Sequence, residues 1–239
     1  MTRRIRITHT AACAVTAIGL LLGTARHAGA AEALFGFSSY DEAETLTVGL
    51  SGGGSVVLNT GGNQGWWSAT FTNTIGNTNY FVGNPLDNSS PQYLRNFFTF
   101  DISDLRGQTV TGATLGVTRY IGLSDSGMTS QTYSLYDVST PASELDLTGG
   151  TSTAIYDDLG TGKSYGSFNV PLVGPGSDNF ALNATGVADL NAAIAGGTTH
   201  FSIGGTLPIP ISAVPEPASV LLLGSGLLGL LGMGKRKAG

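Results

Sequence analysis

Short runs in which apolar and polar residues alternate recur through the middle of the chain. Phe98 and Phe100 alternate with Thr99 and Asp101, for example, and similar runs follow up to residue 203. A period of two places one set of side chains on a single face of a β-strand. Clusters of Gly, Ser, Asn and Pro separate the runs, as is typical of turns. The pattern predicts an antiparallel β-sandwich or barrel, with strands near residues 56–58, 79–82, 98–102, 113–117, 132–135, 168–172, 180–182 and 201–203.

One segment departs from this period. Val187, Leu190 and Ile194 have the spacing of an apolar stripe along a helix. Thr185 precedes the stripe as a candidate N-cap, and Gly196-Gly197 follows it as a stop signal. We therefore predict one short helix over Thr185–Ala195.

The first 30 residues have the composition of an export signal rather than of a folded domain. Arg3-Arg4 and Arg6 give a positive start, residues 11–22 are mostly apolar, and Ala28-Gly29-Ala30 supplies small residues. This order is typical of a secretory signal peptide. We therefore predict that signal peptidase recognises Ala28 and Ala30, so that the exported chain begins at residue 31 or 32. A retained membrane anchor is the alternative, although the apolar run is short for a span.

The last segment, residues 214–239, combines three features in order. Pro215-Glu216-Pro217 comes first, an uncharged stretch over residues 218–234 follows, and Lys235-Arg236-Lys237 stands near the end. As a helix the uncharged stretch would be about 25 Å long, at the short end for crossing a bilayer. The basic residues favour the cytoplasmic side. We therefore expect a transmembrane helix that holds the body, residues 31–213, on the outer face of the membrane.

This tail resembles the PEP-CTERM sorting signal of exopolysaccharide-producing Gram-negative bacteria. The resemblance implies processing by exosortase, a membrane cysteine transpeptidase, near Pro215-Glu216-Pro217. It further implies release from an inner-membrane intermediate to the cell surface or the extracellular space, with exosortase and signal peptidase as partners during export. An ordinary single-pass anchor with an accidental Pro-Glu-Pro sequence is the alternative.

A second, looser resemblance concerns the body. Residues 94–119 run from a predicted strand through Asp101-Ile102-Ser103 and a turn into a strand that carries Ala113 and Leu115. This segment is similar to part of the extracellular jelly-roll domains of the DNRLRE type. The resemblance implies a jelly-roll-like sandwich and no particular function. With the helix predicted above, the expected fold is an all-β, jelly-roll-like sandwich with one short helix.

The charge of the body excludes one class of partner. Residues 31–213 hold four basic and fifteen acidic side chains, a formal charge of −11. Nucleic-acid binding requires clustered Lys or Arg, so we expect no nucleic-acid partner. The single cysteine, Cys13, lies in the predicted signal peptide, and the exported body would therefore have no disulfide and no Cys-ligated metal.

The candidate chemistry of the body is sparse. His200 is the one histidine after residue 30 and has no G-x-S-x-G motif beside it, so we expect no catalytic residue and no cofactor. Carboxylates at Asp157-Asp158, Asp41-Glu42-Glu44, and Asp101 with Asp104 could pair across loops for glycoside hydrolysis. A structural calcium ion is a further option, because calcium prefers several loop oxygens.

Aromatic residues offer one candidate ligand site. Trp66, Trp67 and Tyr93 could form a stacking platform for sugar, with Asn and Gln side chains nearby. The favoured alternative is that these rings fill the core. We therefore predict a non-catalytic exported surface or matrix protein associated with exopolysaccharide and biofilm. The competing interpretation is a module that binds or cleaves matrix polysaccharide, for which two carboxylates in an aromatic-walled cleft would be diagnostic.

Overall fold

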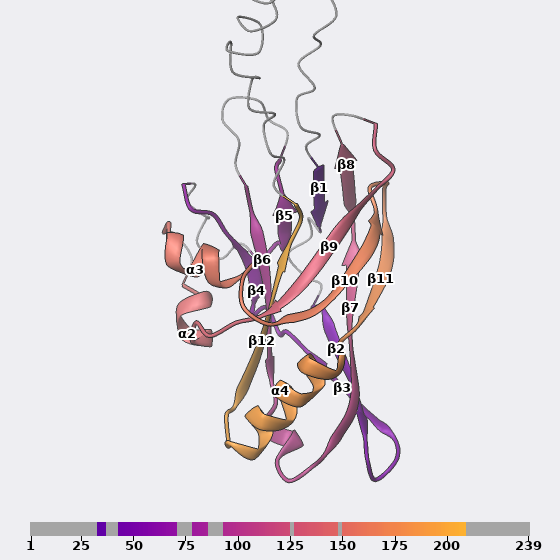
Figure 1. Ribbon diagram of the computed structural model, residues 1–239, viewed down its shortest axis with the longest axis vertical. Coiled ribbons are helices and arrows are strands. Elements are labelled where there is room, and N and C mark those ends of the chain that lie inside the picture. The colour runs from indigo at the N-terminus through magenta and orange to yellow at the C-terminus, as the bar shows by residue number, and fades with distance from the viewer. Residues whose placement is uncertain are drawn as a thin grey trace, which may run out of the picture. The chain divides into compact units, whose positions relative to one another are not determined.

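The computed structural model describes residues 33–36, 43–70, 78–85, 93–124, 127–147 and 150–208 (Figure 1). Antiparallel strands dominate these residues, in three sheets. The four-stranded sheet has the order β11 (Gly176–Ala181), β7 (Val110–Arg119), β2 (Thr45–Leu50) and β3 (Ser55–Asn59). The five-stranded sheet has the order β10 (Ser164–Pro171), β9 (Ser130–Asp137), β12 (His200–Thr206), β6 (Arg95–Asp101) and β4 (Gln64–Trp67).

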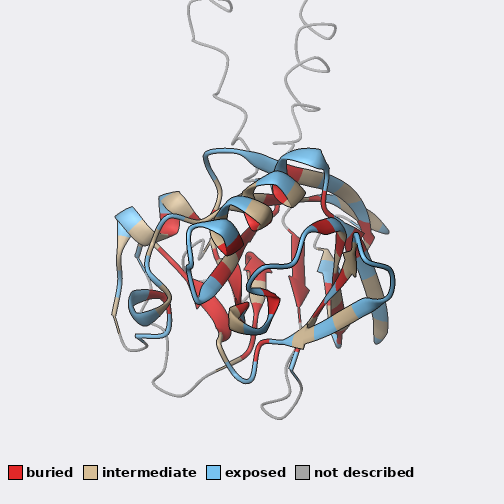
Figure 2. Cartoon of the chain, turned by 90° about the horizontal axis from the view of Figure 1, so that it is seen from below, coloured by how far each residue is buried: buried red, intermediate tan, exposed pale blue. Residues whose placement is uncertain are grey.

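The two larger sheets pack face to face around one apolar core. Tyr133 of the five-stranded sheet contacts Phe180 of the four-stranded sheet, with ring centroids 5.2 Å apart. Phe98 and Leu115, from the two sheets, are fully buried in the same cluster. Figure 2 shows this buried layer between strands whose outer residues are exposed. The structure therefore confirms the predicted antiparallel β-sandwich, because each alternating run turns its apolar set inward.

A small sheet closes one end of the sandwich. It has the order β5 (Phe81–Gly83), β1 (Ala33–Gly36) and β8 (Ile121–Ser124), and its Phe35 side chain enters the core beside Tyr133. The strand predicted at residues 79–82 is displaced to β5. Tyr80 precedes that strand and is fully buried, and its hydroxyl donates to the Thr118 carbonyl oxygen at 2.5 Å.

Strand β6 does not alternate as its sequence predicts, since residues 96–100 are all buried. Its outer face is covered by α2 (Ala142–Leu145) and α3 (Thr153–Asp158), which lie beside β4 and β6 in Figure 1. Phe97, Trp67, Leu145 and Leu159 form a second apolar cluster there. The expectation of a single helix was wrong. The sequence did not reveal α2 and α3 because they are too short to give a helical period.

The longest helix of the described residues, α4 (Ala184–Ala195), confirms the predicted helix within one residue. It packs against β7 of one sheet and β10 and β12 of the other, at the end opposite the small sheet (Figure 1). Its N-cap is Asn183 rather than the predicted Thr185. The Asn183 side-chain oxygen accepts hydrogen bonds from the Thr185 and Gly186 amides at 2.9 and 3.1 Å.

Two adjacent glycines let β12 lie close to its neighbours on both faces. A Cβ at Gly204 would lie 2.5 Å from the Leu159 carbonyl oxygen, and one at Gly205 would collide with Tyr133 and Asn96. Alternate residues of a strand point to opposite faces, so one glycine admits the segment that follows α3 and the other admits the core. The second half of β12 is thereby fixed, and its first half borders the groove described below.

The predicted signal peptide with Ala28 and Ala30, the sorting motif Pro215-Glu216-Pro217, the apolar stretch 218–234 and the basic cluster Lys235-Arg236-Lys237 lie outside the described residues. Within the described ranges, no helix is both long enough and apolar enough to cross a membrane.

Candidate functional site

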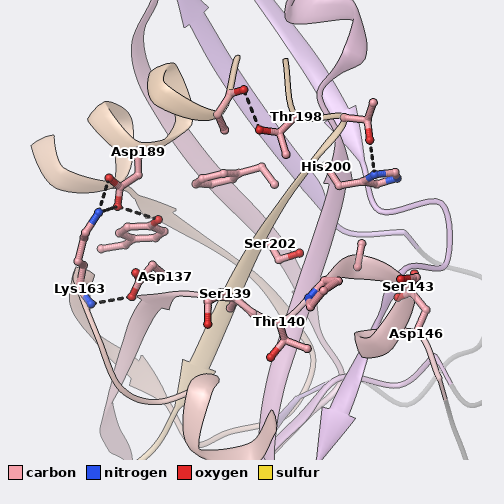
Figure 3. A pocket seen from close by; sticks show the side chains of 17 residues that line it. Asp137, Ser139, Thr140, Ser143, Asp146, Lys163, Asp189, Thr198, His200 and Ser202 are labelled. Carbon is pink, nitrogen blue, oxygen red and sulfur yellow. Dashed lines mark hydrogen bonds and ion pairs between the residues drawn. The ribbon is translucent and has the colours of Figure 1, made fainter. Parts of the chain in front are cut away.

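An open groove of about 780 Å³ lies at the side of the five-stranded sheet, where strands end and helices begin. The end of β9, the start of β10, α2, α4 and the start of β12 all contribute to it (Figure 3). In Figure 3 the Lys163–Asp189 pair lies on one side and Asp146 with Ser143 on the other, with Ser202, Ser139 and Thr140 between them. Hydroxyls and carboxylates therefore dominate its polar surface.

On one side, three residues form an ion-paired cluster. The Lys163 Nζ atom lies 2.8 and 3.0 Å from the two carboxylate oxygens of Asp189, and the Tyr165 hydroxyl donates to the same carboxylate at 3.2 Å. The hydrogen bond to Asp189 raises the pKa of Lys163. Burial, reinforced by the Asp189 charge, raises the pKa of Tyr165 far above its ordinary range. At neutral pH, Lys163 is therefore charged and Tyr165 protonated.

Asp137 ends β9 at the same side of the groove. Its carboxylate accepts a hydrogen bond from the Lys163 backbone amide at 2.6 Å. The Asp137 amide in turn donates to the Lys163 carbonyl oxygen at 3.0 Å. These two bonds hold the ends of β9 and β10 together and fix the Asp137 carboxylate at the groove surface.

The middle of the groove consists of the segment that leads into α2 and of the outer face of β12. Asp158, at the end of α3, accepts four hydrogen bonds from Ser139 and Thr140, at 2.7–3.0 Å. Burial opposes ionisation of Asp158, but these bonds outweigh it and lower its pKa. The Ser202 hydroxyl pairs with the buried Thr99 hydroxyl at 2.9 Å. The polar groups along this part of the groove are thus held in fixed positions.

The other side carries Asp146, the C-cap residue of α2. Burial of its carboxyl raises the pKa of Asp146, and the nearby His200 opposes that shift. Among the described residues, the Asp146 carboxylate has no hydrogen-bond partner. His200 is exposed, and its Nδ1 atom pairs with the adjacent Thr199 hydroxyl at 2.9 Å. No hydrogen bond between described residues joins His200 to a serine or a carboxylate.

The aromatic residues proposed from the sequence as a sugar platform do not lie in this groove. Trp66 and Trp67 are consecutive in β4 and therefore point to opposite faces, and both are buried, at 5% and 6% exposure. The Trp67 Nε1 atom donates to the Leu145 carbonyl oxygen at 3.0 Å beneath α2. Tyr93 is half-buried beside a crevice of about 10 Å³, which has room for a single water. The two tryptophans thus fill the interior, as the favoured alternative had it.

The carboxylates singled out from the sequence are also spread over the fold. Glu44 is buried and accepts a hydrogen bond from the Thr118 amide at 2.7 Å. Asp101 accepts from the amide and hydroxyl of Ser103, which lower its pKa. Asp157 is exposed, 3.8 Å from Arg95. Asp104 is exposed on a 3-10 turn, and Asp41 and Glu42 lie outside the described residues. None of those described lines the groove.

The carboxylates that do line the groove are Asp137, Asp146 and Asp189, and sequence reasoning missed all three. Each stands at the end of a strand or on a helix, separated from the others by whole elements. The pairing of β9 with β10 and the packing of α2 and α4 against β12 bring them to one groove. A weak signal existed for one of them, since Asp189 precedes Leu190 of the apolar stripe and must lie beside the buried face of its helix.

Within the described ranges, no cluster of three or more His, Cys, Asp or Glu side chains could hold a metal ion. The structural calcium ion that the sequence offered as an option stays a prediction.

Comparison with known proteins identifies the tail. Residues 213–237 match the PEP-CTERM protein-sorting motif. The match spans the motif Pro215-Glu216-Pro217, the apolar stretch and the basic cluster, and it covers 25 of the 239 residues. No curated protein and no solved structure matches the chain. The likeness of residues 94–119 to DNRLRE-type jelly rolls therefore stays a prediction.

The class of protein follows from the motif. The chain is an exported protein that exosortase processes, and its destination is the cell surface, reached through the membrane.

Proposed function

We propose that this chain is a non-catalytic surface or matrix protein that associates with exopolysaccharide, and that the groove is where its body contacts the polymer. The sorting motif brings the protein to the cell surface. The polymer is proposed from the resemblance of the tail to the sorting signal of exopolysaccharide-producing bacteria. Biofilm association follows from that contact. Signal peptidase and a transient inner-membrane intermediate belong to the same proposal.

The observation that carries the proposal is the groove itself. Its volume of about 780 Å³ falls within the range of small-ligand sites and leaves room for several sugar units. Sugars present hydroxyls that both donate and accept hydrogen bonds, and the groove offers hydroxyls, carboxylates and an ammonium group in return. An open groove can also contact a polymer that is longer than the groove itself.

The hydrogen bonds around the groove favour holding a ligand over chemistry. Asp189 is engaged by Lys163 and Tyr165, Asp137 joins two strand ends, and Ser202 is paired with Thr99. Groups that stabilise the fold in this way are preorganised for binding. His200 lacks a hydrogen-bonded carboxylate among the described residues, which a general base of the serine-hydrolase type requires for its orientation.

A variant whose side chain obstructs the groove tests the proposal. The processed protein, purified from the native host, is sedimented with that host's exopolysaccharide. Ser143→Trp places a large side chain in the groove from an exposed helical position, and Ala154→Trp places the same side chain on the exposed surface of α3. We expect the wild type and Ala154→Trp to sediment with the polymer and Ser143→Trp to remain in solution. Equal sedimentation of the two variants would refute the proposed contact.

Cleavage of matrix polysaccharide is the second candidate function, and the raised pKa of Asp146 favours it, because a general acid has to keep its proton to a higher pH than an ordinary carboxyl group does. Cleavage predicts release of new reducing ends from the host polysaccharide and loss of that release in Asp146→Asn. Sedimentation without release supports the non-catalytic function.

A further inference from the structure

We propose that the groove prefers polysaccharide segments with positively charged amino-sugar units over neutral segments and over those rich in uronic acid. This inference rests on the proposed function and specifies the chemical class of its ligand. Its basis is the set of charges along the groove: three carboxylates, Asp137, Asp146 and Asp189, face one ammonium group, Lys163.

The ammonium group is already neutralised. Lys163 lies 2.8 Å from Asp189 in a two-oxygen ion pair, so these two residues contribute no net charge to a ligand. Two carboxylates remain, one on each side of the groove. Asp137 is bound to a neutral backbone amide, which orients its carboxylate without cancelling its charge.

Of the two carboxylates, we expect Asp146 to attract a cation more strongly than Asp137 does. Its carboxylate has no hydrogen-bond partner among the described residues, and burial penalises its charged form. A cationic ligand beside it would offset that penalty, whereas a neutral hydroxyl would do so only in part. His200 is the remaining titratable group of this side; it lies near Asp146 and is paired with Thr199.

The electrostatic field of the whole body also favours a cationic ligand. With four basic and fifteen acidic side chains in residues 31–213, the surface repels a polyanion at long range and attracts a polycation. A uronic-acid polymer would meet this repulsion before it reached the groove. An amine-bearing polymer would be attracted by the body as a whole and then by the Asp137 and Asp146 carboxylates.

Three oligosaccharides of equal length separate the charge classes: oligomers of glucosamine, of N-acetylglucosamine and of a uronic acid. Binding to the processed protein is measured by calorimetry at about pH 6.5, above the ordinary pKa of an aspartate side chain and below that of an α-amine. We expect the glucosamine oligomer to bind most tightly, by about fivefold over its N-acetylated form, as one partly exposed ion pair provides. The uronic-acid oligomer should bind most weakly.

Variants assign the preference to the groove. Asp146→Asn should weaken binding of the glucosamine oligomer about fivefold and leave that of the N-acetylated oligomer unchanged. Asp104→Asn makes the same change in net charge at an exposed turn outside the groove and should have no such effect. Lys163→Gln frees the Asp189 carboxylate and should strengthen binding of the glucosamine oligomer. This gain cannot arise from a loss of folded protein.

The outcomes distinguish this inference from the proposed function. Equal or tighter binding of the neutral or uronic-acid oligomer overturns the charge preference, as does an equal effect of Asp104→Asn and Asp146→Asn. If the protein sediments with its host polysaccharide through the groove but shows no preference among the three oligomers, this inference alone is wrong. If Ser143→Trp also leaves sedimentation unchanged, the proposed function fails with it.

Discussion

The carboxylate of Asp158 accepts hydrogen bonds from both the backbone amide and the hydroxyl of Thr140, at 2.8 and 2.7 Å. Asp158 ends α3, and Thr140 lies in the segment that leads into α2 and borders the groove. One acidic side chain thus fixes a groove-lining segment to a helix that does not itself reach the groove. The adjacent Ser139 adds two more bonds to the same carboxylate.

Asp158→Asn should lower the stability of the body by about 1–2 kcal/mol at pH 7, allowing for partial exposure, because an amide nitrogen would then face donors. The native pKa of Asp158 lies below its unfolded value, so its contribution is present above about pH 4 and disappears as the pH falls through the native pKa. Urea unfolding of both proteins should therefore show a difference at pH 7 that shrinks toward pH 3. A difference that grows on acidification would contradict this role.

The start of α4 provides a second test. Asn183→Ala should cost about 1 kcal/mol, because the Thr185 and Gly186 amides would lose their acceptor. Thr185→Ala should cost less than about 0.5 kcal/mol, since Thr185 stands in the first turn and its side chain is exposed. Thermal unfolding of the two variants compares them directly. A larger loss in Thr185→Ala would restore the N-cap predicted from the sequence.

Asn183 and Thr185 show which features of α4 the sequence could predict and which it could not. The apolar stripe located the helix because Leu190 and Ile194 do pack inward. The cap was misplaced because Asn183 and Thr185 are both good N-cap residues, and the sequence alone did not show where β11 ends. Local periodicity thus predicted the element, and the neighbouring strand determined its first residue.

The strands also differ in how well their local sequence pattern predicted which residues are buried. The alternation in β7 predicted its buried face correctly: Ala113, Leu115 and Val117 are buried, and the residues between them are half-buried. In β6 the alternation was misleading, because α2 and α3 bury the outer side chain of Phe97 with Trp67. The sequence could not predict the groove for a related reason. Asp137, Asp146 and Asp189 are brought to one groove by the sheet order and by the positions of α2 and α4, which no local pattern encodes.

The close approach at β12 predicts a steric limit. Gly205→Ala should destabilise the body by about 2–3 kcal/mol, because its Cβ would collide with the Tyr133 hydroxyl and the Asn96 side chain, which are hydrogen-bonded to each other at 2.9 Å. Gly112→Ala is the matched control: this glycine is also in a strand, and no atom lies within 4 Å of its would-be Cβ. We expect it to change stability by no more than about 0.5 kcal/mol. If both variants lost the same free energy of unfolding, the loss would come from replacing any strand glycine and not from the collision at Gly205.

The sorting motif predicts a processing defect that leaves the body intact. Replacement of Pro215, Glu216 and Pro217 together by alanine should prevent exosortase from recognising the exported chain. The apolar stretch would be unchanged, so the protein should accumulate in the membrane fraction as a species larger than the mature form. Fractionation and blotting in the native host would detect it. Wild-type size and wild-type amount outside the cell would mean that the motif is dispensable.

The basic cluster predicts a different failure of the same tail. Lys235, Arg236 and Lys237 should fix the orientation of the apolar stretch, because each contributes roughly 1 kcal/mol of attraction to an anionic cytoplasmic leaflet. Their replacement by glutamine should let the tail cross the membrane after the body. Unprocessed protein should then appear outside the cell, whereas the Pro-Glu-Pro variant retains it in the membrane. Protease added to intact cells would locate the C-terminal end. Retention of the glutamine variant in the membrane with its end still protected would show that the apolar stretch alone sets the orientation.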